Sequence, residues 1–137
     1  IEKHDNPKNP FWYDQLGSFN KDVVLSHRQH IPEFDTYFKE EEIETITFDS
    51  LVEGVNHIDL LHIDTEGYDF EIIKSLDFDK HQPSLILFEH AHLYHGRQRR
   101  RNLRKKVNEV YTYLTKRKYR CVGLGMDTLA IHKDLSK

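Results

Sequence analysis

The sequence predicts a mixed α/β fold in one domain. Three observations support this class: a strand, a helix and a second strand follow one another between residues 58 and 89, a long amphipathic helix comes next, and two short apolar runs complete the pattern. Strands that alternate with helices over short connections are typical of a sheet covered by helices. The length of 137 residues is that of one domain at most.

The composition narrows the class of protein. Aromatic residues make up 12% of the chain, and a chain too polar to fold rarely carries so many. With 20 Lys and Arg against 23 Asp and Glu, the net charge is -3, so no overall basic field favours nucleic acid as a partner. No apolar stretch approaches the roughly 20 residues of a membrane-spanning helix. The single cysteine, Cys121, is compatible with a reducing compartment, and we expect a soluble, cytoplasmic protein.

The chain divides into a lead-in segment, residues 1–42, and an α/β part, residues 43–137. The lead-in is irregular, because Pro7 and Pro10 interrupt a polar stretch and the aromatic run FWYDQLGSF has no clear period. A segment of this kind is more often a lid or a docking arm than a solvated tail. Residues 20–30 are expected to form a short helix.

The α/β part begins with a predicted strand at residues 43–48, IETITF, which is β-branched and alternates in polarity. Asp49 then suits the N-cap of a short helical turn that Gly54 ends. A mostly apolar run at residues 58–63 is typical of a strand covered on both faces.

A helix and a second buried strand, residues 84–89, follow that run. The apolar residues of this helix are spaced to lie on one face: Tyr68, Ile72, Ile73 and Leu76. A strand, a helix and a strand in this order predict a parallel pair with a right-handed crossover. A longer helix is predicted to begin at Arg97 and to end before Lys118. Two antiparallel strands, residues 119–124 and 128–132, are expected to close the fold.

Ligands of open parallel sheets bind beyond the carboxyl ends of the strands. This rule selects residues 62–67 and 88–92. If the two strands are neighbours, four side chains converge on one cleft: Asp64, Glu66, Glu89 and His90. A carboxylate and an imidazole in such a place can orient a substrate hydroxyl or accept its proton.

A purely structural role is the alternative for the first of these segments. Asp64 or Thr65 would then cap the next helix, Glu66 would interact favourably with the helix dipole, and Gly67 would allow close packing.

Histidines also cluster after the second buried strand, which raises the question of a metal. The candidate ligands are Glu89, His90, His92 and His95, but their spacing matches no specific metal motif and no HExxH or cysteine pair is present. We therefore predict no metal site, and a metal-dependent hydrolase is the least favoured alternative.

The basic run from Arg97 to Lys106 is dense enough to bind a phosphate or an acidic polymer. It stands at a helix start, where positive charge opposes the dipole, and it has no interleaved aromatic residue that could stack on a base. A solvated face is favoured, and the alternative function is a catalytically inert module that binds an anionic glycan or a lipid head group. No GxGxxG, P-loop or GxSxG motif is present.

The segment from Thr47 to Leu51 and the run from Ile58 to Ile73, with the core Ile63-Asp64-Thr65-Glu66-Gly67, resemble the FkbM family of S-adenosylmethionine-dependent methyltransferases. The similarity continues through Pro83, the strand ending at Glu89 and the Asp127-Thr128 pair, and Leu16 to Phe19 resembles a serine-containing stretch of that family. It spans roughly residues 16–132.

This resemblance implies a Rossmann-like class I methyltransferase sheet of seven strands with an antiparallel last pair. It also implies S-adenosylmethionine as cofactor and O-methylation of a hydroxyl on a sugar, a glycan or a related small molecule. In this frame Asp64 is the first candidate for base or orienter and His90 the second, with Glu66 and Glu89 as hydrogen-bonding supports. Asp64 and Thr65 are assigned to the cofactor. The substrate contacts are assigned to Ser18, His92 and Arg97.

The chain departs from this family at its cofactor-binding strands. The resembled methyltransferases hold the cofactor with a glycine-rich first loop and with an acidic residue after the second strand, and neither has a counterpart here. We therefore expect the chain to be the C-terminal part of such a domain, with a truncated homologue as the alternative. An incomplete sheet edge would also favour pairing with a second copy.

Overall fold

The structure is a computed structural model that describes residues 6–92 and 99–136. Helices and strands alternate through most of this range, as a mixed α/β class requires. The α-helices are α1 (Lys21–Ser26), α2 (Phe34–Tyr37), α3 (Phe48–Leu51), α4 (Asp69–Ser75) and α5 (Arg99–Thr115). The strands are β1 (Leu60–Ile63), β2 (Leu85–Glu89), β3 (Tyr119–Leu124) and β4 (Asp127–His132). The 3-10 turns are η1 (Tyr13–Gln15), η2 (Arg28–His30) and η3 (Lys133–Ser136).

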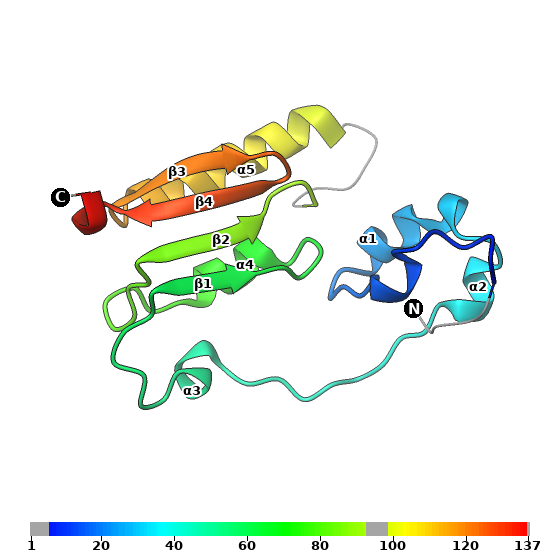
Figure 1. Cartoon of the computed structure of the whole chain (residues 1–137), viewed down its shortest axis with the longest axis horizontal. Helices are drawn as coiled ribbons and strands as arrows, with labels where there is room; N and C mark the ends of the chain where they lie inside the picture. The colour runs from blue at the N-terminus through cyan, green and yellow to red at the C-terminus, as the bar shows by residue number, and fades with distance from the viewer. Residues whose placement is uncertain (1–5, 93–98, 137) are drawn as a thin grey trace.

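The four strands form one sheet in the order β1-β2-β4-β3 (Figure 1). β1 and β2 are parallel, with Ile63 opposite Phe88, and this confirms the predicted strand-helix-strand unit. β4 pairs antiparallel with both β2 and β3, which confirms the predicted closing pair. Within the described residues β1 and β3 are the edges of the sheet. Pairing through an edge with a second copy stays a prediction.

One face of the sheet carries the main core, and α4 and α5 cover it. In Figure 1 both helices lie behind the strands. The helices contribute buried side chains from Phe70 and Ile73 of α4 and from Val110 and Leu114 of α5. The sheet contributes Ile63, Ile86, Phe88, Tyr119 and Ala130.

The prediction that β1 is covered on both faces is wrong. Leu60 remains 51% exposed and His62 is also exposed, because β1 lies at the sheet edge and no helix in the described residues packs on that face. The predicted face of α4 is confirmed for Ile73 and Leu76, which are buried in the core, but not for Tyr68. Tyr68 is the N-cap and is 41% exposed, whereas Phe70 turns into the core, because the helix begins one residue later than the apolar spacing indicated.

Residues 6–38 form a separate small unit beyond the carboxyl end of β1 (Figure 1). It contains the predicted short helix, α1, and the aromatic residues of the lead-in do not form a solvated tail. They pack with aliphatic neighbours into a second apolar cluster: Tyr13, Leu16, Val24, Ile31, Phe34 and Tyr37.

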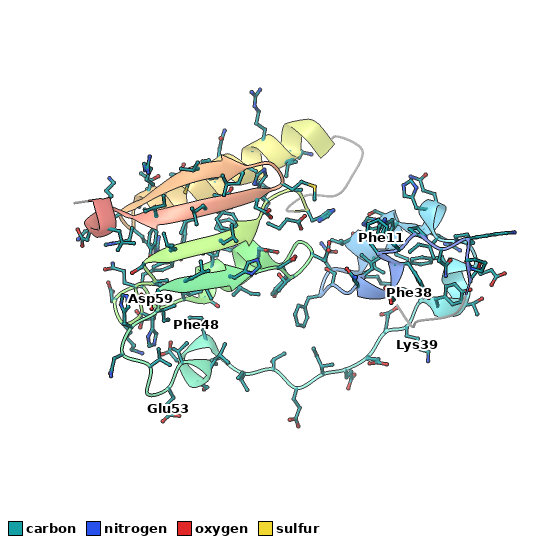
Figure 2. All side chains as sticks on the ribbon, viewed as in Figure 1. Phe11, Phe38, Lys39, Phe48, Glu53 and Asp59 are labelled. Atoms are coloured by element: carbon teal, nitrogen blue, oxygen red, sulfur yellow. The ribbon has the colours of Figure 1, made fainter. Side chains whose placement is uncertain are left out.

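An extended segment connects this unit to α3, and Figure 2 marks its two ends with the labels at Lys39 and Phe48. The predicted strand at residues 43–48 is wrong. Ile43 is 62% exposed and Ile46 is 71% exposed, because no strand of the described sheet lies beside them and strand propensity needs such a partner.

The predicted cap of the next turn is also corrected. Thr47 and not Asp49 is the N-cap of α3, where its side chain accepts the backbone N–H of Ser50 at 3.2 Å. Gly54 takes a left-handed φ of 79° and ends the turn as expected. Among the helices of the described ranges, none is long and apolar enough to cross a membrane.

Candidate functional site

The two segments that follow β1 and β2 lie side by side, because these strands are parallel neighbours. The first segment, residues 64–67, makes a tight turn with two consecutive left-handed residues, Glu66 at φ 51° and Gly67 at φ 98°. A Cβ on Gly67 would lie 2.6 Å from the carbonyl oxygen of His92, so the close-packing role considered for this glycine fits the geometry. Left-handed non-glycine residues such as Glu66 are uncommon and are enriched at functional sites.

Asp69, the first residue of α4, is fully buried and hydrogen-bonds to this turn. One of its carboxylate oxygens accepts the hydroxyl of Thr65 at 2.9 Å and the backbone N–H of Gly67 at 3.3 Å. The other accepts the backbone N–H of Glu89 at 3.1 Å. Burial raises the pKa of Asp69, while these donors act in the opposite direction.

Asp69 was missed in the sequence because an aspartate in the first helical turn is usually a solvated favourable charge. The structure also excludes the alternative in which Asp64 or Thr65 caps α4. The N-cap is Tyr68, and Thr65 donates to the side chain of Asp69 instead.

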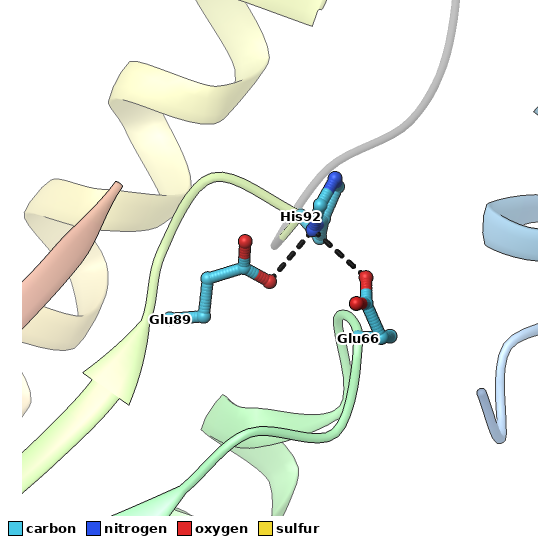
Figure 3. A group of neighbouring side chains, drawn as sticks. All are labelled: Glu66, Glu89 and His92. Atoms are coloured by element: carbon cyan, nitrogen blue, oxygen red, sulfur yellow. Dashed lines mark hydrogen bonds and ion pairs between the residues drawn. The ribbon is translucent and has the colours of Figure 1, made fainter. Parts of the chain in front are cut away.

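Glu66, Glu89 and His92 meet at one imidazole nitrogen (Figure 3). The Nδ1 atom of His92 lies 2.6 Å from Oε2 of Glu89 and 3.0 Å from Oε2 of Glu66. Burial raises the pKa of Glu66; the charge of His92 lowers it, and the nearby carboxylates of Glu89, Asp64 and Asp69 raise it further. The cluster therefore concentrates negative charge around a single imidazole.

His90 faces elsewhere, so the predicted convergence of four side chains is only partly correct. Its Nδ1 atom lies 3.0 Å from the hydroxyl of Thr128, which also hydrogen-bonds Tyr111 at 3.1 Å. Its backbone N–H donates to the carbonyl of Met126 at 2.9 Å, which continues the pairing of β2 with β4 and fixes this direction. In the described residues His92 takes the place beside Glu66 and Glu89 that was predicted for His90.

A groove of about 700 Å³ opens between the turn after β1 and the N-terminal unit. Asp64 and Thr65 are among the residues that line it, and Asp64 is exposed to solvent. The remaining lining mixes apolar and charged side chains: Leu16, Gly17, Ser18, Phe19, Lys21, Val24, Phe38, Lys39, Glu40, Glu41 and Ile43. The cofactor candidates Asp64 and Thr65 and the substrate candidate Ser18 thus share one groove.

Comparison with protein families gives a match for this chain. The sequence pattern of the methyltransferase FkbM domain matches residues 3–121. The chain belongs to the FkbM methyltransferase family. The suspected family is confirmed, and the match supports methyl transfer as the activity. Searches of curated proteins and of solved structures gave no match.

The residues matched to the FkbM domain include all those that line the groove, and they also include Glu66, Glu89 and His92. Within this FkbM domain Ser18 has a structural contact as well as its place in the groove. Its hydroxyl donates to the carbonyl oxygen of Glu66 at 2.7 Å and accepts the backbone N–H of Asn20 at 3.0 Å. The ring of Phe19 packs on Tyr68 with centroids 5.4 Å apart. These contacts join the N-terminal unit to the turn after β1.

Two further predictions concern the basic run from Arg97 to Lys106 and the histidine at position 95. Arg97 and His95 lie outside the described residues, so their assignments stay predictions. Arg104 and Lys105 are exposed on α5, on the segment that the anion-binding alternative would use. That alternative also stays a prediction.

Proposed function

We propose that this FkbM-family protein is an S-adenosylmethionine-dependent O-methyltransferase whose acceptor is a hydroxyl of a sugar or a related small molecule. The observation that supports the proposal most directly is the groove at the carboxyl end of β1, which Asp64 lines, in a chain of a methyltransferase family. The antiparallel pair formed by β3 and β4 supports the class I sheet that the family resemblance implies.

The groove suits S-adenosylmethionine in size and in chemistry. A volume of about 700 Å³ lies within the range of small-molecule sites. Phe19 and Phe38 offer flat apolar surface for a purine, and the carboxylate of Asp64 offers a counter-charge for a sulfonium. When bound, this cofactor supplies an electrophilic methyl group, and Asp64 and Thr65 are the residues assigned to hold its reactive end.

Asp64 has the clearest chemical role among the groove residues. An unactivated alcohol is a weak nucleophile, so a base that takes its proton and fixes its direction accelerates methyl transfer. In the proposal a carboxylate oxygen of Asp64 accepts the hydroxyl proton of the acceptor. Because Asp64 lines the groove and His90 does not, this role falls to Asp64 and not to His90.

The hydroxyls of Thr65 and Ser18 act as positioning groups in this proposal. Thr65 donates to the buried carboxylate of Asp69, and Ser18 donates to the carbonyl of Glu66, so both hydroxyls already hold the turn that carries Asp64. Rigid placement of this kind reduces the entropy that is lost when an acceptor is aligned for reaction.

An assay of methyl transfer by the wild-type chain and by two matched variants tests this proposal. The purified chain is incubated with isotopically labelled S-adenosylmethionine and methyl hexosides, and methylated product is measured. Asp64→Asn is expected to lower turnover by about 100-fold or more, in the range of a lost general base. The control is Asp59→Asn at the other end of β1, where the carboxylate is 94% exposed and pairs with His57.

The possible outcomes test the role of Asp64 and the identity of the methyl donor separately. Label transfer that falls with Asp64→Asn and persists with Asp59→Asn supports it. Equal turnover in both variants would remove the role of Asp64. Absence of cofactor binding by calorimetry in the wild-type chain would count against S-adenosylmethionine as the donor for this chain.

A further inference from the structure

The cluster of Glu66, Glu89 and His92 lies apart from the groove. None of the three side chains lines the groove, although the turn at residues 64–67 contributes to both places. The three come from different segments, the turn after β1, the end of β2 and the residues that follow it (Figure 3). Their ligand-type atoms lie within 4.8 Å of one another.

The hydrogen bonding inside the cluster is incomplete. The Nδ1 atom of His92 carries at most one hydrogen, and its shorter contact, 2.6 Å, is with Glu89. The Oε2 atom of Glu66 is fully buried and has no hydrogen-bond partner, although it lies 3.0 Å from the same nitrogen. A buried carboxylate oxygen without a donor is costly, so this position calls for a further positive group.

The spacing of the three groups suits a divalent cation. With metal–ligand bonds of roughly 2.1 Å, neighbouring ligand atoms lie about 3.0 Å apart in octahedral coordination and about 3.4 Å apart in tetrahedral coordination. The distances from His92 Nδ1 to the two carboxylate oxygens, 2.6 and 3.0 Å, are close to the octahedral value. An imidazole with two carboxylates is a ligand set that first-row transition metals accept.

The surrounding contacts fix the backbone at each of the three residues. The carbonyl oxygen of Glu66 accepts the hydroxyl of Ser18 at 2.7 Å, and the backbone N–H of Glu89 donates to Asp69. Gly67 packs against the backbone of His92, where only a residue without a Cβ fits.

We propose that Glu66, Glu89 and His92 form a binding site for a divalent transition-metal ion such as Mn²⁺ or Zn²⁺. Three protein ligands leave the other coordination positions to water or to a hydroxyl of a bound molecule. The proposal goes beyond methyl transfer, and it holds or fails without reference to the acceptor or to the methyl donor.

Calorimetric titration of the EDTA-treated, dialysed chain with MnCl₂, and separately with ZnCl₂, tests the site. One ion per chain is expected for at least one of the two metals. Glu66→Gln and His92→Ala are each expected to weaken that binding by at least about 10-fold. Electron paramagnetic resonance of bound Mn²⁺ gives a second readout that is independent of heat.

Matched controls separate this site from the other histidines and acids of the chain. Glu71→Gln changes an exposed glutamate of α4 that pairs with Lys74, and His81→Ala changes a histidine beside Asp49. Both are expected to bind the ion as the wild type does. If His92→Ala folds poorly, Glu66→Gln is still sufficient to test the site, because the side chain of Glu66 is 30% exposed and lies in a turn.

Two results would overturn the proposal. One is no binding of either ion to the folded wild-type chain. The other is binding that Glu66→Gln and His92→Ala leave unchanged while circular dichroism shows both variants folded, because the ion then binds to other residues.

Discussion

The carboxylate of Asp69 accepts the backbone N–H of Glu89 at 3.1 Å, and so ties the start of α4 to the end of β2. The same side chain accepts the hydroxyl of Thr65 and the N–H of Gly67 through its other oxygen. A single buried group thus connects the two segments that carry the candidate site.

Asp69→Asn is expected to destabilise the fold by about 3 kcal/mol. The two carboxylate oxygens of Asp69 both accept hydrogen bonds, whereas an asparagine side chain has only one acceptor oxygen, so its NH₂ group would face one of the present donors. Urea denaturation measures the loss. Asp79→Asn, at an exposed position, is the matched control and should unfold within about 0.5 kcal/mol of the wild type. Similar midpoints for the two variants would mean that Asp69 does not have this role.

Elements with a strong local pattern could be predicted from the sequence. The stripe that includes Val110 and Leu114 identified α5, and the apolar run before Glu89 identified β2. Residues 43–48 have an equally clear alternation, yet they form no strand. The difference is that a strand also needs a neighbouring strand, and nothing within six residues can indicate whether one is there.

The arrangement at the candidate site could be predicted only in part. The position of Asp64 after a parallel strand follows from topology, and this expectation agrees with the structure. The directions of His90 and His92 do not follow from their spacing. The direction of His90 depends on Met126, which lies more than thirty residues further along the chain and accepts the backbone N–H of His90. His92 instead contacts Glu66, which lies in the turn after β1. Such contacts between distant residues are invisible to local periodicity.

Cys121 is expected to be a slowly reacting thiol. Burial raises its pKa to about 11, so at pH 8 its thiolate fraction falls by about 100-fold relative to an ordinary thiol. Since the thiolate is the nucleophile, alkylation by iodoacetamide should be slow at pH 8 and should accelerate up to about pH 11. The same chain in denaturant is the control and should react at the rate of a free peptide. Equal rates for native and denatured chain would contradict the burial of this thiol.

Ser18→Ala is expected to loosen the N-terminal unit from the turn after β1. The variant loses the hydrogen bond to the carbonyl of Glu66, at a cost of about 1 kcal/mol. Cleavage by a protease within residues 6–38 should become faster, and amide exchange at Asn20 should increase. Ser75→Ala removes a bond of equal length, 2.7 Å, to a carbonyl of its own helix, and it should leave cleavage in residues 6–38 unchanged. Equal protection in both variants would show that Ser18 does not hold the unit in place.

Gly67→Ala combines two separable penalties. Its left-handed φ of 98° costs an L-residue about 1–2 kcal/mol, and the new Cβ would lie 2.6 Å from a backbone oxygen that cannot rotate away, which adds about 1–3 kcal/mol. Gly54→Ala is the matched control, because its φ is 79° and a Cβ there meets nothing within 4 Å. Thermal and urea unfolding should therefore show a larger loss at Gly67. The excess measures the close approach of the turn to His92, and equal losses at both glycines would mean that this approach relaxes without cost.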